Sequence, residues 1–244
     1  TSKDRGESQA GYVVRVLSVC PSRGRPEILQ QMVDSFLKTT TDAELVVMID
    51  DDQTDLYLIS PEGEKSGRVE YIVGKRRPLV EMMNDAIQAR LQDFDVFGMM
   101  VDDGKFMTPG WDSFVCNYLD GCPDKIGVVS PAHNCGRHCD MPYVSREWIE
   151  RLGWYAHPDF KYWCWPTYTM LLGETTRIRH CANDEFFILH DDLGPSRWDL
   201  KDEDASAFYA HCLWQFPFNV DKLKTRRPIS YDEPPVDWRC PCRP

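Results

Sequence analysis

Two groups of carboxylates stand directly after short apolar segments of this 244-residue sequence. Asp50 to Asp52 follow Glu44–Ile49, and the pair Asp102 and Asp103 follows Val96–Val101. Like charges repel at short range, so neighbouring acids are costly unless they are paired or bind a cation. Divalent ions such as Mg²⁺ and Mn²⁺ prefer oxygen ligands. These acids are therefore candidate ligands of Mn²⁺ or Mg²⁺, and the alternative is the ordinary use of Asp in turns and helix caps.

Two arginines, Arg23 and Arg25, lie in the stretch Cys20–Pro26, which follows another apolar segment, Tyr12–Val19. The forked donors of a guanidinium group match the oxygens of a phosphate. A divalent ion stabilises the charge that develops when a phosphate group leaves. Arginines and carboxylates on one edge of a sheet would therefore suit a phosphorylated ligand.

The spacing of apolar residues predicts the elements that would bring these groups together. Short β-branched runs are typical of buried strands, whereas apolar residues three and four apart are typical of helices. We expect strands over 12–19, 44–49, 69–73, 96–101 and 126–129, and helices over 27–38, 78–91 and 111–119. This alternation indicates an α/β fold with a mostly parallel twisted sheet flanked by helices, whose ligands bind outside the carboxyl ends of the strands. Pro and Gly in 20–26 predict a loop that ends the first strand.

Composition and charge restrict the function. A hydrophobic fraction of 42% and eight Trp residues indicate a folded chain with a sizeable core. The net charge of −11 is unfavourable for a nucleic-acid scaffold, since duplex binding relies on Lys and Arg contacts to phosphate. No apolar run approaches the roughly 18 residues of a membrane helix, so we expect no membrane partner and a cytoplasmic location.

A second metal site is suggested by four soft or borderline ligands within seven residues, His133, Cys135, His138 and Cys139. Zn²⁺ accepts imidazole and thiolate ligands, so a structural Zn²⁺ is one interpretation of this stretch. The spacing matches no usual zinc signature, and ordinary buried or loop thiols are the alternative.

The order of these segments resembles family 2-type glycosyltransferases of the GT-A (Rossmann-like) fold. The resemblance starts with Pro21–Pro26 and the two acidic strand ends, and 101–112 is similar to the metal-binding segment of that family. Segment 141–154 is similar to its acceptor-side strand and helix, and Phe187–His190 to its late strand. The chain also resembles phage-encoded enzymes that glycosylate hydroxymethylated pyrimidines in DNA. The resemblance covers about residues 12 to 215.

The resemblance implies a domain organisation. Residues 12–225 would form a single GT-A domain, with a nucleotide-sugar half over 12–130 and an acceptor half over 131–225. A flexible N-terminus over 1–11 and a Pro-rich tail over 226–244 would flank it.

The resemblance also assigns roles to residues at the predicted strand ends. The first loop and the acids after the second strand would contact the nucleotide, together with a basic residue before the helix over 78–91. These nucleotide-sugar-binding candidates are Pro21, Ser22, Arg23, Arg25, Asp50, Asp51, Arg76, Arg77 and Asp102. Asp103 would bind the metal directly, and His190 would complete the metal site; a histidine that is merely satisfied within a strand is the alternative for His190.

One departure concerns the catalytic base of inverting relatives. The aligned position lies near Trp165, where this chain has no carboxylate. Asp159, a few residues upstream, is the catalytic candidate, and Asp140 and Glu174 are weaker ones. A retaining enzyme without such a base is the other interpretation.

Aromatic residues are concentrated in the acceptor half, and sugars and bases both stack on aromatic faces. They are Trp148, Trp154, Tyr155, Tyr162, Trp163, Trp165 and Tyr168. Core packing is the alternative. We therefore expect a metal-dependent glycosyltransferase of the hexosyltransferase type that uses a nucleotide sugar, such as a UDP-sugar. Its acceptor would be a glycan, a protein, a small molecule or a hydroxymethylated DNA base, although the net charge disfavours DNA. A nucleotidyltransferase of the same fold and a non-catalytic nucleotide-sugar-binding module are the competing hypotheses.

Overall fold

A seven-stranded sheet in the order β3-β2-β1-β4-β8-β6-β9 forms the centre of the protein, and a small sheet in the order β5-β10-β7 lies beside it. The computed structural model describes residues 15–57, 66–134, 141–191 and 201–224. The strands are β1 (Val16–Ser22), β2 (Glu44–Asp50), β3 (Val69–Gly74), β4 (Val96–Met99), β5 (Gly104–Phe106), β6 (Val128–Ser130), β7 (Ala132–His133), β8 (Tyr143–Ser145), β9 (Arg179–Cys181) and β10 (Phe187–His190). The expected tails, 1–11 and 226–244, lie outside the described residues.

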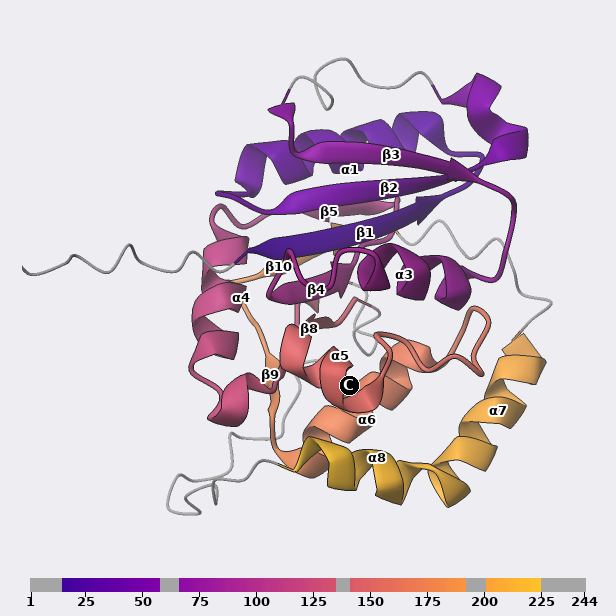
Figure 1. Cartoon of the computed structure of the whole chain (residues 1–244). Helices are drawn as coiled ribbons and strands as arrows, with labels where there is room; N and C mark the ends of the chain where they lie inside the picture. The colour runs from indigo at the N-terminus through magenta and orange to yellow at the C-terminus, as the bar shows by residue number, and fades with distance from the viewer. Residues whose placement is uncertain (1–14, 58–65, 135–140, 192–200, 225–244) are drawn as a thin grey trace, which may run out of the picture.

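Helices and 3-10 turns connect these strands. They are α1 (Pro26–Thr39), η1 (Asp51–Leu56), α3 (Leu79–Gln88), α4 (Trp111–Asp120), η2 (Pro123–Lys125), α5 (Arg146–Leu152), α6 (Trp165–Thr176), α7 (Lys201–Trp214) and α8 (Phe216–Leu223). Figure 1 shows α1 behind the parallel strands and α3 in front of them, so helices cover both faces of the sheet. No helix within the described ranges is both long and apolar enough to cross a bilayer.

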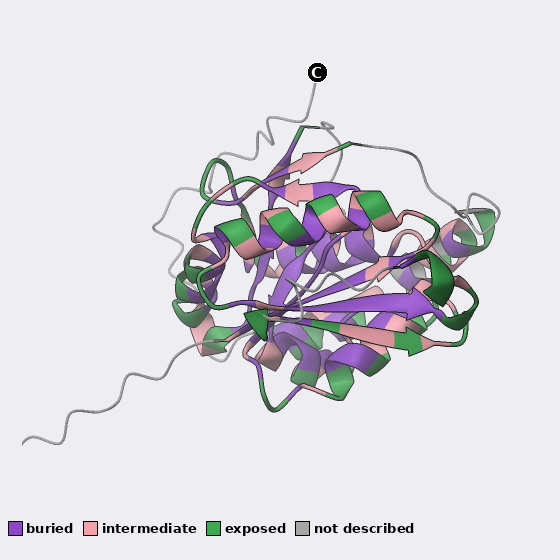
Figure 2. Ribbon diagram, turned by 90° about the horizontal axis from the view of Figure 1, so that it is seen from above, coloured by how far each residue is buried: buried purple, intermediate pink, exposed green. Residues whose placement is uncertain are grey.

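The fold class expected from the sequence is confirmed. Strands β3, β2, β1 and β4 are parallel neighbours, and β8 is inserted antiparallel between β4 and β6. Strand β2, which has strand neighbours on both sides and is buried over residues 45–50, is accordingly a near-continuous apolar run, whereas the edge strand β3 exposes Glu70 and Val73. Figure 2 shows this buried layer between helices whose outer faces are exposed.

In helix α1, the apolar residues that predicted a helix are the ones that the structure buries. Its buried residues Leu29, Met32, Val33 and Phe36 are three or four positions apart and face the sheet. Pro26 occupies the first turn, where its missing N–H leaves no intrahelical bond unmade.

The expected end of the first strand is wrong. Strand β1 continues through Cys20 and Pro21 to Ser22 instead of breaking after Val19. The carbonyl of Val19 accepts from the amide of Met100, so Val19 faces the β4 side, and Pro21, two residues later, faces the same side. Strand β4 has ended there, so the missing N–H of Pro21 costs no ladder bond while β2 still pairs with β1.

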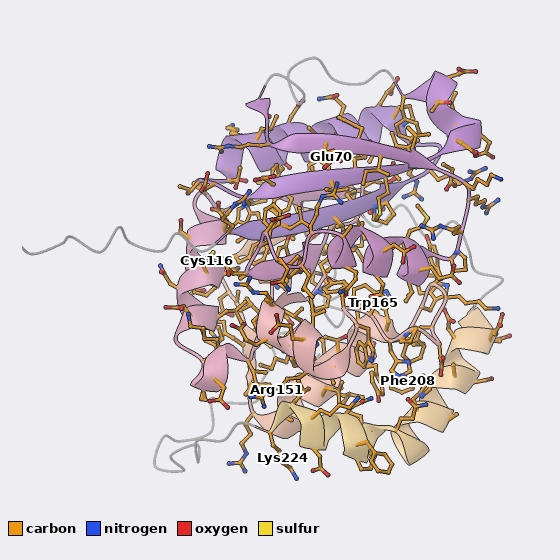
Figure 3. The ribbon with its side chains drawn as sticks, in the orientation of Figure 1. Glu70, Cys116, Arg151, Trp165, Phe208 and Lys224 are labelled. Carbon is orange, nitrogen blue, oxygen red and sulfur yellow. The ribbon has the colours of Figure 1, made fainter. Side chains whose placement is uncertain are left out.

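The aromatic residues of 131–225, the expected acceptor half, divide into two groups. Trp148, Tyr155, Trp165 and Tyr168 are no more than 1% exposed and belong to the core. Trp165, labelled in Figure 3, lies 5.3 Å from Tyr155 between ring centroids. The half-buried members are Trp154, Tyr162 and Trp163. A stacking surface for an acceptor is therefore limited to this second group.

Candidate functional site

The turn between β4 and β5 carries Asp102 and Asp103, which are 8% and 5% exposed. Strand β10 pairs antiparallel with β5, and His190 stands opposite Gly104 in the register. This pairing places Nε2 of His190 3.1 Å from Oδ1 of Asp103. The amide of Asp191 also donates to the carbonyl of Asp103 at 3.0 Å. The structure thus brings together the two residues that the sequence comparison proposed as metal ligands.

Gly104, opposite His190, is closely packed by apolar side chains. A Cβ built on Gly104 would lie 2.6 Å from Cε of Met100 and 3.2 Å from Cγ2 of Ile188. An added Cβ would displace the flexible end of Met100 and tighten the contact with Ile188.

Asp102 is held from the end of β1. The hydroxyl of Ser22 donates to Oδ2 of Asp102 at 2.8 Å, and Tyr57 shares a hydrogen bond with Ser22 at 2.9 Å. Tyr57 also accepts from the amide of Arg25 at 3.3 Å. Tyr57 was missed in the sequence because a single tyrosine after a polar segment gives no periodic or spacing signal.

Arg25 faces both acids. Its Nη1 lies 3.2 Å from Oδ2 of Asp103 and 3.4 Å from Oδ1 of Asp102. Burial raises the pKa of Asp102, and the nearby negative charge of Asp103 adds to that rise, whereas Ser22 and Arg25 oppose it. Burial likewise raises the pKa of the Cys20 thiol beneath them, with the two acids adding to the effect. A further positive charge would favour the ionised form of this acid pair.

Arg23 is engaged by the acids after β2. Its Nη1 lies 2.6 Å from Oδ2 of Asp50 and 2.6 Å from Oδ1 of Asp52, and its Nη2 lies 2.7 Å from Oδ2 of Asp52. These hydrogen bonds from Arg23 hold the pKa of Asp52 below its usual range. Asp51 is exposed in η1. Arg23 therefore pairs with both Asp50 and Asp52, and Asp52 belongs to the acidic group although the family resemblance gave it no role.

Arg76 and Arg77 follow β3 and are both exposed. Arg77 lies 2.6 Å from Oδ2 of Asp85 on α3. Hydrogen bonding to Arg23 is the main cause of the lowered pKa of Asp52, and the charge of Arg76 adds to it. Arg77 is instead directed toward the helix.

The candidate bases have other partners. Oδ2 of Asp159 lies 2.9 Å from Nε2 of His211, and Glu174 pairs with Arg179. Neither of these contacts involves Asp102 or Asp103. Asp140 lies outside the described residues. The position near Trp165 starts α6 with a buried indole, so no carboxylate is supplied there.

The stretch proposed for Zn²⁺ is described only in part. His133 is buried in β7, with its ring centroid 6.4 Å from that of His190. Cys135, His138 and Cys139 lie outside the described residues, so the Zn²⁺ hypothesis for this stretch stays a prediction.

Comparisons with known proteins bear on the fold. No family model matches the sequence, and no curated protein matches it significantly. Among solved structures, the mannosyltransferase PcManGT from Pyrobaculum calidifontis in complex with GDP-Man and Mn²⁺ superposes with a TM-score of 0.54 at 14% identity, over 87% of this chain and 73% of that one. S. aureus TarS superposes with a TM-score of 0.57 at 10% identity, over 82% of this chain and 40% of TarS.

A TarS fragment, residues 1–349, in complex with UDP-GlcNAc gives a TM-score of 0.55 at 10% identity, over 78% of this chain and 64% of the fragment. The chain therefore has a GT-A-like fold, similar to that of nucleotide-sugar-dependent glycosyltransferases. It spans less than half the length of the full TarS chain that it matches.

Proposed function

We propose that the protein transfers a sugar from a nucleotide-sugar donor, with Mn²⁺ or Mg²⁺ held by Asp103 and His190. The observation that carries the proposal is the meeting of these two residues, beside Asp102 and Arg25, at the carboxyl edge of the parallel strands. Ligands of open α/β sheets bind at this edge.

The donor atoms suit such an ion. Two ligands at right angles, each about 2.1 Å from an octahedral ion, are roughly 3 Å apart. The 3.1 Å between Nε2 of His190 and Oδ1 of Asp103 fits this separation. Sites for Mg²⁺ use one or two protein carboxylates and leave the other positions to water and substrate phosphates. When bound, the ion would offset the negative charge that develops on the departing nucleotide diphosphate.

The residues around the acid pair have distinct tasks in this proposal. Arg25 already contacts both acids and supplies a fixed positive charge beside the position of the diphosphate. Ser22, supported by Tyr57, fixes the orientation of Asp102 toward the ribose or the metal. Arg23 and Asp50 are the candidates for contact with the nucleotide base, together with the exposed Asp51, Arg76 and Arg77.

Candidates for the donor come from the similar solved structures, and candidates for the acceptor come from half-buried aromatic side chains and net charge. PcManGT was solved with GDP-Man and TarS with UDP-GlcNAc, so both UDP-sugars and GDP-sugars are candidates for this chain. Half-buried Tyr162 and Trp163 offer stacking faces for an acceptor sugar or base. The net charge of −11 favours a glycan, a small molecule or a protein over DNA. Asp159 stays the candidate catalytic base.

Ligand-dependent thermal unfolding tests the proposal. The full chain would be heated with UDP-sugars or GDP-mannose, each with and without Mn²⁺. A ligand at about 100 times its Kd adds roughly 2.7 kcal/mol of stability. At about 2–4 °C per kcal/mol, the midpoint should rise by several degrees. The rise should require Mn²⁺, disappear in Asp103→Asn and persist in Asp120→Asn, which alters an exposed acid on α4.

Product analysis separates the competing functions. Release of nucleoside diphosphate from the stabilising sugar donor would support a glycosyltransferase. Release of pyrophosphate from a nucleoside triphosphate would instead indicate a nucleotidyltransferase. Mn²⁺-dependent binding without turnover on any acceptor would favour a binding module, as the buried Trp165 at the position of the usual base suggests. Absence of any nucleotide-dependent shift would overturn the proposal.

A further inference from the structure

Three metal-ligating side chains meet in a group that contains Asp159, the candidate base, but neither Asp103 nor His190. His157 and Asp159 lie in the segment after α5, and His211 lies on α7. One ligand atom from each residue comes within 4.8 Å of the other two. His157 and His211 are 4% and 6% exposed, whereas the Asp159 side chain is 57% exposed. The group is thus a buried imidazole pair with one carboxylate open to solvent.

The spacing of residues on α7 explains why this group forms. Asp204, Phe208 and His211 are three or four positions apart, so they lie along one side of α7, and Gln215 directly follows its last residue. The Asp204 carboxylate accepts hydrogen bonds from the amides of Lys161, Tyr162 and Trp163 at one end of this side. Phe208, labelled in Figure 3, packs against Phe160 and Tyr168 in the middle.

His211 and Gln215 complete the contact at the other end of α7. Oδ2 of Asp159 lies 2.9 Å from Nε2 of His211, and the rings of His157 and His211 are 4.1 Å apart between centroids. A shared cation would account for the convergence of these two imidazoles and the carboxylate. The Nδ1 atom of His211 is buried and, within the described part of the chain, has no hydrogen-bond partner. Nε2, on the other side of the ring from this atom, is the nitrogen that an ion beside Asp159 would bind.

Gln215 orients His157 as metal sites usually require. The Nε2 atom of His157 lies 2.9 Å from Oε1 of Gln215, and Nδ1 of His157 accepts weakly from the amide of Asp159 at 3.3 Å. Gln215 therefore holds the proton on Nε2, and the lone pair stays on Nδ1, beside Asp159. Metal-ligating histidines commonly donate their other ring N–H to such an acceptor, which fixes the tautomer.

We propose that His157, Asp159 and His211 form a binding site for Zn²⁺, separate from the Asp103 and His190 pair. Zn²⁺ binds imidazole nitrogen and carboxylate oxygen about 2.0–2.2 Å away, so tetrahedral ligands are roughly 3.4 Å apart. The closest pair here, at 2.9 Å, needs to open by a few tenths of an ångström. The exposed carboxylate provides an entry path, and water would occupy the fourth position.

The site would join two parts of the acceptor half. Asp204 already attaches the start of α7 to the segment 161–163, and Zn²⁺ would attach the end of α7 to His157 and Asp159. Figure 1 shows α7 and α8 along the outer side of α6, away from the parallel strands. An ion that binds only the folded chain stabilises it, so Zn²⁺ should hold these helices in place.

Co²⁺ substitution of the metal-free full chain is the direct test, because bound Co²⁺ reports its ligands in the visible spectrum. We expect one Co²⁺ with a tetrahedral nitrogen and oxygen spectrum, displaced by Zn²⁺ and retained in Asp103→Asn. Asp159→Asn should weaken Zn²⁺ binding at least 100-fold, about the upper end of what the loss of an outer partner costs. Gln215→Leu should weaken it about 10- to 100-fold by releasing the His157 tautomer.

Matched controls decide between sites. Asp221→Asn removes an exposed carboxylate of the neighbouring α8, which pairs with Lys224, and should leave Zn²⁺ affinity unchanged. Thiolate-to-cobalt charge transfer, with affinity unaffected by Asp159→Asn, would assign the ion to the cysteine-containing stretch 133–139 and overturn the proposal. So would the absence of any Zn²⁺ or Co²⁺ binding in the folded wild-type chain. Loss of binding in Asp103→Asn alone would overturn it as well.

Discussion

The Nε2 atom of His190 lies 3.1 Å from Oδ1 of Asp103, although 87 residues separate the two in the sequence. The pairing of β10 with β5 creates this contact, because it sets His190 opposite Gly104. The proposed metal site thus depends on a small three-stranded sheet as much as on the large parallel one.

Removing this imidazole should weaken Mn²⁺ binding. We expect His190→Gln to lower the affinity by at least about 10- to 100-fold, the cost of losing even an outer partner. Titration of Mn²⁺ followed by electron paramagnetic resonance measures the effect. His180→Gln, which alters a half-buried histidine stacked on Tyr118, is the control. Equal Mn²⁺ affinity in wild type and His190→Gln would contradict the assignment of His190.

Arg25 should contribute to donor binding. Charge-assisted hydrogen bonds contribute about 1.5–3 kcal/mol, so Arg25→Gln should raise the Kd for the donor roughly 10- to 150-fold. Isothermal titration calorimetry in the presence of Mn²⁺ measures this change. Arg90→Gln serves as the control, because Arg90 pairs with the exposed Glu70 on β3, labelled in Figure 3. A change of equal size in both variants would rule out a specific role for Arg25.

Replacing Asp159 tests the candidate base independently of Zn²⁺ binding. If Asp159 removes the acceptor proton, Asp159→Asn should lower kcat about 100-fold or more and leave the donor Kd unchanged. The loss should persist when Zn²⁺ is saturating. Full activity of Asp159→Asn would exclude it as the base and leave only a structural task for this carboxylate.

Stability at acid pH should depend on Asp112. Burial raises the pKa of this carboxyl, but hydrogen bonds from the amides of 41–43 and the Thr40 hydroxyl outweigh burial, and the net pKa is lowered. A lowered folded-state pKa stabilises the protein above the unfolded-state pKa of about 3.9 and loses this effect as pH falls through the folded value.

Asp112→Asn should therefore destabilise the protein by about 2–3 kcal/mol at pH 7, and the difference from wild type should shrink below about pH 4. Urea unfolding at several pH values measures it. A difference that stays constant from neutral to acid pH would show that the charge of Asp112 is not responsible.

Gly98 should tolerate no side chain. It stands opposite Tyr143 across the β4–β8 pair, and a Cβ there would lie 2.3 Å from the tyrosine ring. Tyr143 is fixed in turn by a 2.8 Å hydrogen bond with Ser18. We expect Gly98→Ala to cost about 1–3 kcal/mol, measured by urea unfolding. Gly74→Ala is the control, since nothing lies within 4 Å of its added Cβ.

The first half of the fold was predictable because local signals and tertiary packing agree there. In α1, residues at helical spacing are those that the sheet buries, and β2 reads as a continuous apolar run because both of its faces are covered. Helix α7 was not predicted. Its buried Asp204 accepts hydrogen bonds from the amides of Lys161 and Tyr162, and no residue pattern within α7 predicts this contact.

The candidate site was likewise predictable only in part. Asp102 and Asp103 were found from their place at a strand end, and His190 only from the resemblance of its segment to a late strand. Tyr57 was missed because its task depends on where η1 places it beside Ser22. The end of β1 was misplaced because the effect of Pro21 depends on the length of the neighbouring β4.

During translation, β10 is synthesised after β1, β4 and β5, which position the acid pair. The strands that carry Asp103 leave the ribosome long before Phe187–His190 does, so a nascent chain holds the acid pair without its imidazole partner. Contacts between distant parts of a chain form slowly because loop closure must precede them. Tight Mn²⁺ retention should consequently mark chains that have finished folding, and truncation before β10 should yield a protein with acidic side chains but little metal affinity.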